Sequence, residues 1–185
     1  MLATKSVVIM GATGMGKMKI SIDASRVIDG KVVNADKMQI YYGLDITTNK
    51  VCPIDQSGIP HHVIGTISST TGDFPVSFFR SIATTTAKSI VRHGRIPVLV
   101  GGSNSLMHGF LMDHLDPSLV NPFAIAGYLP TFRFRSCLLW IHASESIFNE
   151  YLNRRVDNML VAGLVEELKD YFDTVFGGKL VKHLG

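Results

Sequence analysis

A glycine-rich segment near the start of the chain constrains the fold more than any other feature. The segment reads Gly11-Ala12-Thr13-Gly14-Met15-Gly16-Lys17, with the glycine and lysine spacing of a Walker A loop. A β-branched run at 6–10 predicts a buried strand before it, and apolar residues at helical spacing predict a helix over 18–27 after it. This context favours a cradle of backbone N–H groups and one ammonium for a phosphate or diphosphate. The alternative is a glycine-rich turn with a chance lysine.

The residue after the lysine departs from the Walker A pattern. That position is normally Ser or Thr, whose hydroxyl binds Mg²⁺. Here it is Met18, and a thioether is a poor ligand for a hard cation. We therefore expect the phosphate cradle to be present without its usual metal ligand, and we assign no metal-binding residue.

Strand and helix patterns alternate along the rest of the chain. This alternation predicts an α/β fold, in which a parallel sheet like that of the P-loop NTPases is flanked by helices. The whole chain, 1–185, is interpreted as one domain. Further strands are expected at 31–35, 96–100 and 136–141, and helices at 73–91, 106–111 and 144–172 with a break at Gly163, while 116–130 is loop-like.

Parallel strands should gather two polar segments beside the glycine-rich loop. Asp36 follows the strand at 31–35, and a small-residue loop, 101–105, follows the strand at 96–100. Asp36 could be a metal-associated group, a general base or a helix N-cap. His61 and His62 lie side by side in an extended segment and point in opposite directions, so we expect one packed and one exposed ring, not a joint metal site.

Composition excludes several classes of protein. Of the 185 residues, 46% are hydrophobic and 18% charged, which predicts a real core. The net charge of +3 is too weak to indicate a nucleic-acid surface. Cys52 and Cys137 form no CxxC pair, so neither a zinc site nor a structural disulfide is expected. No apolar run is long enough to span a membrane, and we expect no targeting leader because the first strand begins at about residue 6.

Several segments, taken together with 11–17, agree with one family. They are 34–41, 43–50, Pro60-His61-His62, 101–105, 155–160 and 163–167. In these segments the chain resembles the isopentenyltransferases that make cytokinins, most closely the plant adenylate type and more distantly the tRNA dimethylallyltransferases. The glycine-rich loop alone is shared with many NTPases, whereas the combination is far more specific to this family.

The resemblance implies a prenyl transfer in cytokinin biosynthesis. Dimethylallyl diphosphate would donate its five-carbon group to N6 of AMP, ADP or ATP, with Mg²⁺ as the cofactor that the family leads us to expect. Asp36 would be the catalytic base, and Lys17 and Thr13 would contact the diphosphate. The substrate-binding residues implied by the resemblance are Gly11, Ala12, Thr13, Gly14, Met15, Gly16, Lys17, Met18, Thr48, Ser103 and Arg155.

Two positions and one segment depart from the family pattern. Met18 replaces Ser or Thr, and Ala35 stands where serine is usual. Residues 180–185 only roughly match a motif that family members carry well before their C-termini. We therefore expect the C-terminal part of the family domain to be missing and the activity to be reduced. The compartment is not predicted, because relatives in plastid and cytoplasm differ mainly in a leader.

Three other functions remain open. A tRNA dimethylallyltransferase needs a larger basic surface than this charge and length provide, so tRNA is not expected as a partner. A P-loop phosphotransferase depends even more on the Mg²⁺-binding hydroxyl, and Met18 argues against it. A non-catalytic nucleotide-binding relic is favoured by Met18 and by the end of the chain at residue 185.

Overall fold

A parallel sheet forms the centre of the molecule. The computed structural model describes residues 5–68, 72, 74–116, 121, 129 and 131–174. Within them, five strands pair in parallel in the order β3-β2-β4-β1-β5, which confirms the α/β class. The strands are β1 (Lys5–Gly11), β2 (Gly30–Asn34), β3 (His61–His62), β4 (Ile96–Gly101) and β5 (Arg135–Ile141).

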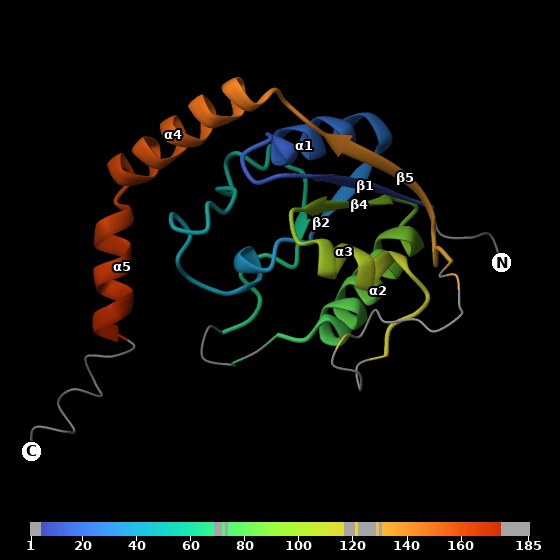
Figure 1. Ribbon diagram of the computed structural model, residues 1–185. Helices are drawn as coiled ribbons and strands as arrows, with labels where there is room; N and C mark the ends of the chain where they lie inside the picture. The colour runs from blue at the N-terminus through green and yellow to red at the C-terminus, as the bar shows by residue number, and fades with distance from the viewer. Residues whose placement is uncertain are drawn as a thin grey trace, which may run out of the picture.

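Helices cover both faces of the sheet. Figure 1 shows α1 on one face and α2 and α3 on the other. The central strands are buried on both sides, as their β-branched sequences indicate. The helices are α1 (Lys17–Ile28), α2 (Val76–Arg92), α3 (Asn104–Leu111), α4 (Glu145–Val161) and α5 (Leu164–Phe172), with a short 3₁₀ helix, η1 (Met38–Ile40).

Adjacent residues on each central strand belong to two separate hydrophobic clusters. Val8 and Val33 pack with α2 and α3, where Phe79 and Phe110 are fully or almost fully buried. Their neighbours, such as Ile9 and Val32, belong to the cluster that packs on α1. Because successive side chains of a strand point to opposite faces, this division fixes the register and therefore the level at which each strand ends.

Three sequence predictions need correction or lie outside the described residues. Helix α2 begins at Val76, after Pro75, because proline suits the N-terminal boundary of a helix. His61 and His62 are both half-buried, so the expected pair of one packed and one exposed ring is wrong. The short strand β3 forms the edge of the sheet, and partial burial lowers the pKa of both imidazoles. Residue 73, most of 116–130, and 180–185 lie outside the described residues.

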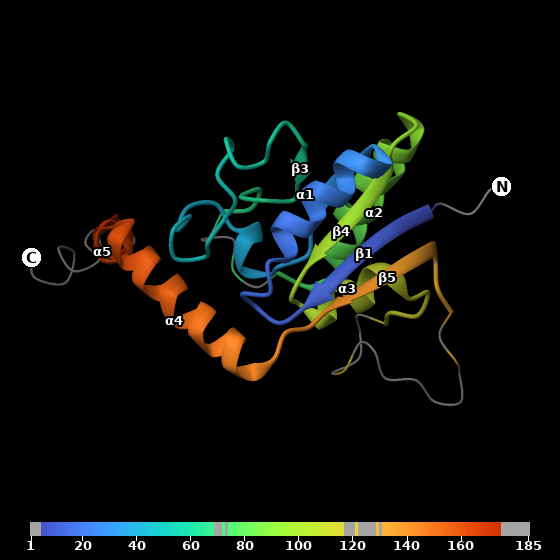
Figure 2. The same cartoon turned by 90° about the horizontal axis from the view of Figure 1, so that it is seen from above.

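The last two helices form an arm beyond the sheet. Helix α4 leaves the carboxyl end of β5, and α5 follows after Gly163, whose φ of 100° allows the turn (Figures 1 and 2). No described residue of either helix is buried. The segment between β2 and β3 lies between the sheet and this arm in both views. Among the described residues, no helix combines the length and the apolar character needed to cross a bilayer.

The two-sided core predicts unequal effects for neighbouring aromatic residues of α2. Phe79 is fully buried, whereas Phe78 is 47% exposed. We expect Phe79→Ala to lower the free energy of unfolding by about 3–5 kcal/mol through cavity formation. Phe78→Ala, the matched control, should cost about 1 kcal/mol. Urea unfolding followed by circular dichroism measures both, and equal losses would contradict this assignment of the core.

Candidate active site

The glycine-rich loop joins β1 to α1 and leaves the start of the helix open to a ligand. Gly16 is the N-cap residue of α1 with φ 68° and no side-chain hydrogen bond, so the first N–H groups of the helix are not capped by its side chain. Gly14 has φ 86°, and a Cβ added there would lie 2.8 Å from Leu152 Cδ2 of α4. The predicted cradle therefore lies directly under the arm, and the positive φ of Gly14 favours glycine at this position.

A cavity of about 380 Å³ opens at this loop. It brings together side chains from four separate segments: Thr13 and Lys17 at the loop, Asp36 after β2, Lys50 from the following loop and Arg155 from α4. The strand-end argument from the sequence is thereby confirmed for Asp36. The other lining residues are Gly14, Met15, Gly16, Met18, Lys19, Asn34, Gln39, Asn49, Val51, Cys52, Asp55, Val100, Gly101 and Tyr151.

Lys17 is the cation at the centre of the cradle. Its Nζ donates a hydrogen bond to the Ala12 carbonyl oxygen at 2.6 Å, which holds the side chain against the loop. Burial lowers the pKa of Lys17, the Asp36 carboxylate opposes this change, and the Arg155 guanidinium adds to it. A bound anion would relieve both the burial cost and the repulsion from Arg155. The electrostatics therefore favour an anionic ligand between Lys17 and Arg155.

Asp36 lines the same cavity and also caps a turn. Its Oδ1 accepts the Met38 N–H at 3.1 Å, at the start of η1. The side chain of Asn34 fixes the backbone around it, because Asn34 Oδ1 accepts the Asp36 N–H at 3.2 Å and Nδ2 donates to the Val63 carbonyl at 3.0 Å. The N-cap residue of η1 is Lys37, so Asp36 closes this turn without being the helix N-cap, and the bond uses one of the two carboxylate oxygens. It leaves the proposed basic function compatible with the geometry.

Ser103 and Thr48 are each held by hydrogen bonds within the protein. Ser103 Oγ accepts the Lys37 N–H at 2.9 Å and so supports the segment that carries Asp36. Thr48 Oγ1 donates to the Leu44 carbonyl at 2.7 Å and accepts from Lys50 Nζ at 2.9 Å. Among the described residues, neither lines the cavity at the glycine-rich loop. Their contact with a substrate remains a prediction. In the structure, Ser103 orders the backbone next to Asp36, and Thr48 orders the segment 43–50.

The small-residue loop 101–105 lies next to the glycine-rich loop, as expected. A Cβ added at Gly102 would lie 3.9 Å from both Lys17 Nζ and Thr13 Oγ1. Within the described part of the chain, Gly11 and Ala12 do not line the cavity themselves. Instead, Ala12 offers its carbonyl to Lys17, and a Cβ at Gly11 would lie 2.5 Å from the Ile141 carbonyl oxygen of β5. Ala12 and Gly11 therefore support the loop through their backbone atoms: Ala12 holds Lys17, and Gly11 lets β1 approach β5 closely.

A second cavity, of about 680 Å³, adjoins the first. The two are lined in common by Asn49, Lys50, Val51, Cys52, Tyr151 and Arg155. Sequence reasoning assigned no site function to Lys50 or Tyr151. A signal was available for both: Lys50 ends the family-like segment 43–50, and Tyr151 lies four residues before Arg155, on the same helical face.

Position 18 does not suit Mg²⁺. Met18 lines the cavity, and its Sδ lies 3.2 Å from His61 Nε2 and 3.6 Å from Ser21 Oγ. The sulfur therefore contacts a ring nitrogen where the usual motif places a hydroxyl. In the part of the chain that the structure describes, no group of three or more His, Cys, Asp or Glu residues could hold a metal ion. We derive no chemical step through Mg²⁺.

Lys17 should give the binding of pyrophosphate a distinctive pH dependence. Because its pKa is lowered, the ammonium loses its proton at a lower pH than an ordinary lysine, and affinity should fall as the pH rises through that value. Lys17→Met should weaken binding by about 2 kcal/mol, or roughly 30-fold. Lys17→Arg should keep the charge and remove the decline. Isothermal titration calorimetry measures these affinities, with Lys88→Met on the exposed face of α2 as the control; an unchanged affinity in Lys17→Met would refute the cradle.

Met18→Thr should restore a hydroxyl next to Lys17. We expect Mg²⁺ to raise pyrophosphate affinity about tenfold more in this variant than in the unaltered chain, which corresponds to about 1.4 kcal/mol. Met18→Leu keeps an apolar side chain without oxygen and serves as the control. Calorimetric titrations with and without Mg²⁺ decide the matter, and equal responses of the two variants would show that the hydroxyl is not the cause.

Comparison with known proteins finds relatives that are similar in sequence. The family described as IPP transferase matches residues 39–123. The chain is 39% identical to adenylate isopentenyltransferase 8, chloroplastic, of Arabidopsis thaliana over 182 residues, which cover 98% of this chain and 55% of the relative. It is 40% identical to adenylate isopentenyltransferase of Humulus lupulus over 167 residues, which cover 89% and 51%, respectively. The chain thus spans about half the length of the curated relatives it matches.

The fold also matches solved structures. A tRNA delta(2)-isopentenylpyrophosphate transferase from Staphylococcus epidermidis superposes with a TM-score of 0.79 at 22% identity. The match covers 94% of this chain and 75% of that protein. This likeness concerns the fold, while the curated relatives and the matched family carry the sequence relationship. Residues 39–123 therefore match the IPP transferase family, and the chain is similar in sequence to plant adenylate isopentenyltransferases.

Proposed function

We propose that this chain transfers a dimethylallyl group from dimethylallyl diphosphate to N6 of AMP, ADP or ATP, as in cytokinin biosynthesis. One observation carries the proposal: Lys17, Arg155 and Asp36 line a single cavity that shares a wall with a larger one. A prenyl transfer needs a site for the diphosphate, a base beside it, and a site for the nucleotide on the other side of that base. The names of the curated relatives favour adenylate as the acceptor.

The smaller cavity is the proposed site of the diphosphate. Backbone N–H groups of the glycine-rich loop, the N-terminus of α1 and the two cations Lys17 and Arg155 would bind its oxygens. As the allylic C1–O bond breaks, negative charge grows on the departing diphosphate. These fixed donors stabilise that charge without rearrangement, and this is the main catalytic contribution that we assign to the loop.

Asp36 is the proposed base. The N6 amine attacks C1 of the dimethylallyl group, a C–N bond forms, and the C–O bond to diphosphate breaks. The nitrogen must then lose one proton, which the Asp36 carboxylate accepts. The products are N6-dimethylallyl nucleotide, pyrophosphate and one proton. The backbone bonds from Asn34 keep the carboxylate at the cavity wall throughout.

The larger cavity is the proposed site of the acceptor. Its volume of about 680 Å³ lies in the range of small-molecule sites. Its walls combine apolar surfaces, such as Tyr42, Ile64 and Met159, with polar groups from Asn49 and Asn158. A purine ring fits the apolar walls, and its polar edges can bond to the amides. The shared wall would place N6 next to the donor carbon.

A tRNA acceptor is the second candidate. It is supported by the fold, which a tRNA delta(2)-isopentenylpyrophosphate transferase shares. The net charge of only +3 favours the free nucleotide instead, because a polynucleotide acceptor needs many phosphate contacts. The two candidates differ in what they prenylate, so one assay separates them.

The assay incubates the purified chain with dimethylallyl diphosphate, Mg²⁺ and either AMP, ADP, ATP or unmodified tRNA. Mass spectrometry detects the N6-prenylated adenine. Product on free nucleotides alone supports the first candidate, and product on tRNA alone supports the second. Binding of nucleotide and pyrophosphate without any product would show that the chain is a non-catalytic nucleotide-binding protein.

Asp36→Asn should separate chemistry from binding. An amide cannot accept the N6 proton, so we expect kcat to fall about 100-fold or more. The carboxamide oxygen of this variant would still accept the Met38 N–H, so pyrophosphate affinity should change by less than about threefold. Single-turnover prenylation and calorimetry give the two values. If affinity and turnover fell together, Asp36 would be structural.

A further inference from the structure

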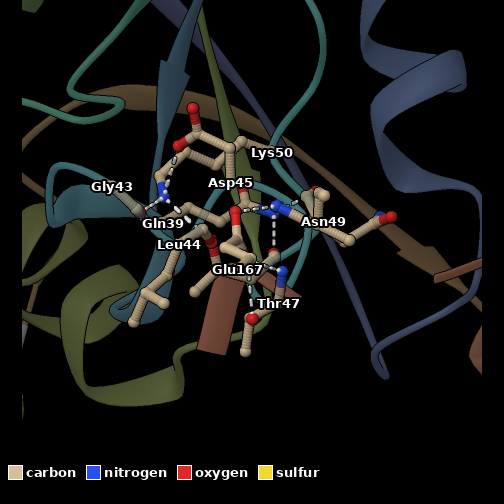
Figure 3. Close-up of polar contacts among 10 residues, drawn as sticks. Gln39, Gly43, Leu44, Asp45, Thr47, Asn49, Lys50 and Glu167 are labelled. Atoms are coloured by element: carbon tan, nitrogen blue, oxygen red, sulfur yellow. Dashed lines mark hydrogen bonds and ion pairs between the residues drawn. The ribbon is translucent and has the colours of Figure 1, made fainter. Parts of the chain in front are cut away.

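The carboxylate of Glu167, on the arm, accepts hydrogen bonds from the loop 43–50, which lines both cavities. Glu167 of α5 accepts the Ile46 N–H on Oε1 at 2.9 Å and the Thr47 N–H on Oε2 at 2.7 Å. Thr47 Oγ1 donates to the same Oε2 at 2.7 Å. Figure 3 shows the Glu167 side chain reaching into the segment 43–50, about 120 residues earlier in the chain. Charge-assisted bonds of this kind are stronger than bonds between neutral groups.

The carboxylate stays ionised in this position. Burial alone would raise the pKa of Glu167, but hydrogen bonds from Thr47 and from the backbone of Ile46, Thr47 and Asp45 outweigh it and lower the pKa. Glu166, the adjacent residue, is exposed to solvent. The contact is therefore specific to one of two neighbouring glutamates.

The segment bonded to Glu167 is itself held together as a unit. Lys50, whose side chain is only 6% exposed, pairs with Asp45 at 3.0 Å and donates to Thr48 Oγ1 at 2.9 Å. Gln39 Nε2 donates to the carbonyls of Thr48 and Asn49 at 3.1 and 3.0 Å. These bonds are drawn in Figure 3. A displacement at Thr47 would therefore move the whole of 43–50, including Asn49 and Lys50.

The loop and the arm that this contact joins both help to line the larger cavity. The loop contributes Asp45, Ile46, Asn49 and Lys50, and the arm contributes residues of α4 between Tyr151 and Met159 and also Ala162, which follows the helix. Glu167 follows α4 after the turn at Gly163. No described residue of α4 or α5 is buried. Apolar packing therefore contributes little to holding the arm in place, and polar contacts such as that of Glu167 matter more.

We propose that Glu167 is a positioning residue for the acceptor: it ties the arm to the loop 43–50 and so fixes the width of the cavity that receives the adenine nucleotide. This inference rests on the proposed function for the identity of the acceptor. Among the described residues that line the two cavities, Glu167 is not included. Its effect should be larger on nucleotide binding than on pyrophosphate binding, because pyrophosphate keeps Lys17 and the glycine-rich loop and loses only part of its contact with Arg155 of α4.

Glu167→Gln is the decisive variant. The amide keeps the size of the side chain but replaces one acceptor oxygen with a donor, so it can no longer accept hydrogen bonds from both Ile46 and Thr47. We expect the Ile46 and Thr47 amides to exchange hydrogen at least about tenfold faster, and the dissociation constant for AMP to rise at least about tenfold. The dissociation constant for pyrophosphate, which depends mainly on Lys17 and the glycine-rich loop, should rise by a clearly smaller factor than that for AMP. Glu166→Gln, on the exposed neighbour, is the matched control and should change none of the three.

A second variant keeps the test decisive if Glu167→Gln fails to fold. Thr47→Val removes only the hydroxyl bond to Oε2 and keeps both backbone bonds, so it should give smaller shifts in the same direction. Unchanged exchange and unchanged AMP affinity in both variants would overturn the proposal, as would an equal loss of AMP and pyrophosphate binding.

The outcome is also separable from that of the proposed function. Where the unaltered chain binds AMP but forms no prenylated product, the catalytic proposal fails, while the exchange and affinity measurements still test Glu167. Where product forms but Glu167→Gln leaves KM for AMP unchanged, the positioning function fails and the prenyl transfer stands.

Discussion

The parallel register of the central strands is the constraint on which the site depends. Strand β1 pairs with β4 so that Met10 lies opposite Gly101, and with β5 so that Gly11 lies opposite Ile141. Strand β2 pairs with β4 so that Asn34 lies opposite Val100. All of these strands end at one level, and the residues that follow them meet there. Neither the glycine-rich loop nor Asp36 could form this site alone.

The part of the site that follows from strand ends could be predicted from the sequence. Buried β-branched runs located the strands, and the rule that parallel strands end together placed Asp36 and the loop 101–105 beside Lys17. The edge strand was harder to interpret. His61 and His62 were expected to differ in burial, but both are half-buried. The local sequence pattern does not say which distant segments pack against an edge strand.

The contribution of the arm could not be predicted from local pattern. Arg155 was named as a substrate-binding residue only because of the family resemblance. The position of α4 over Gly14 and the contact of Glu167 with Thr47 join segments more than 100 residues apart. A glutamate on a polar helix gives no sign of its partner when the partners are backbone N–H groups, because every residue except proline carries one.

The exposed end of β5 has a practical consequence. Trp140 is the single tryptophan of the chain, and it is 66% exposed. It lies opposite Met10, one residue before the glycine-rich loop. Its indole should therefore fluoresce with the red-shifted emission of a hydrated ring, and any molecule or segment that covers this strand would move the emission to shorter wavelength. The chain thus carries its own optical reporter beside the cradle, free of background from other indoles.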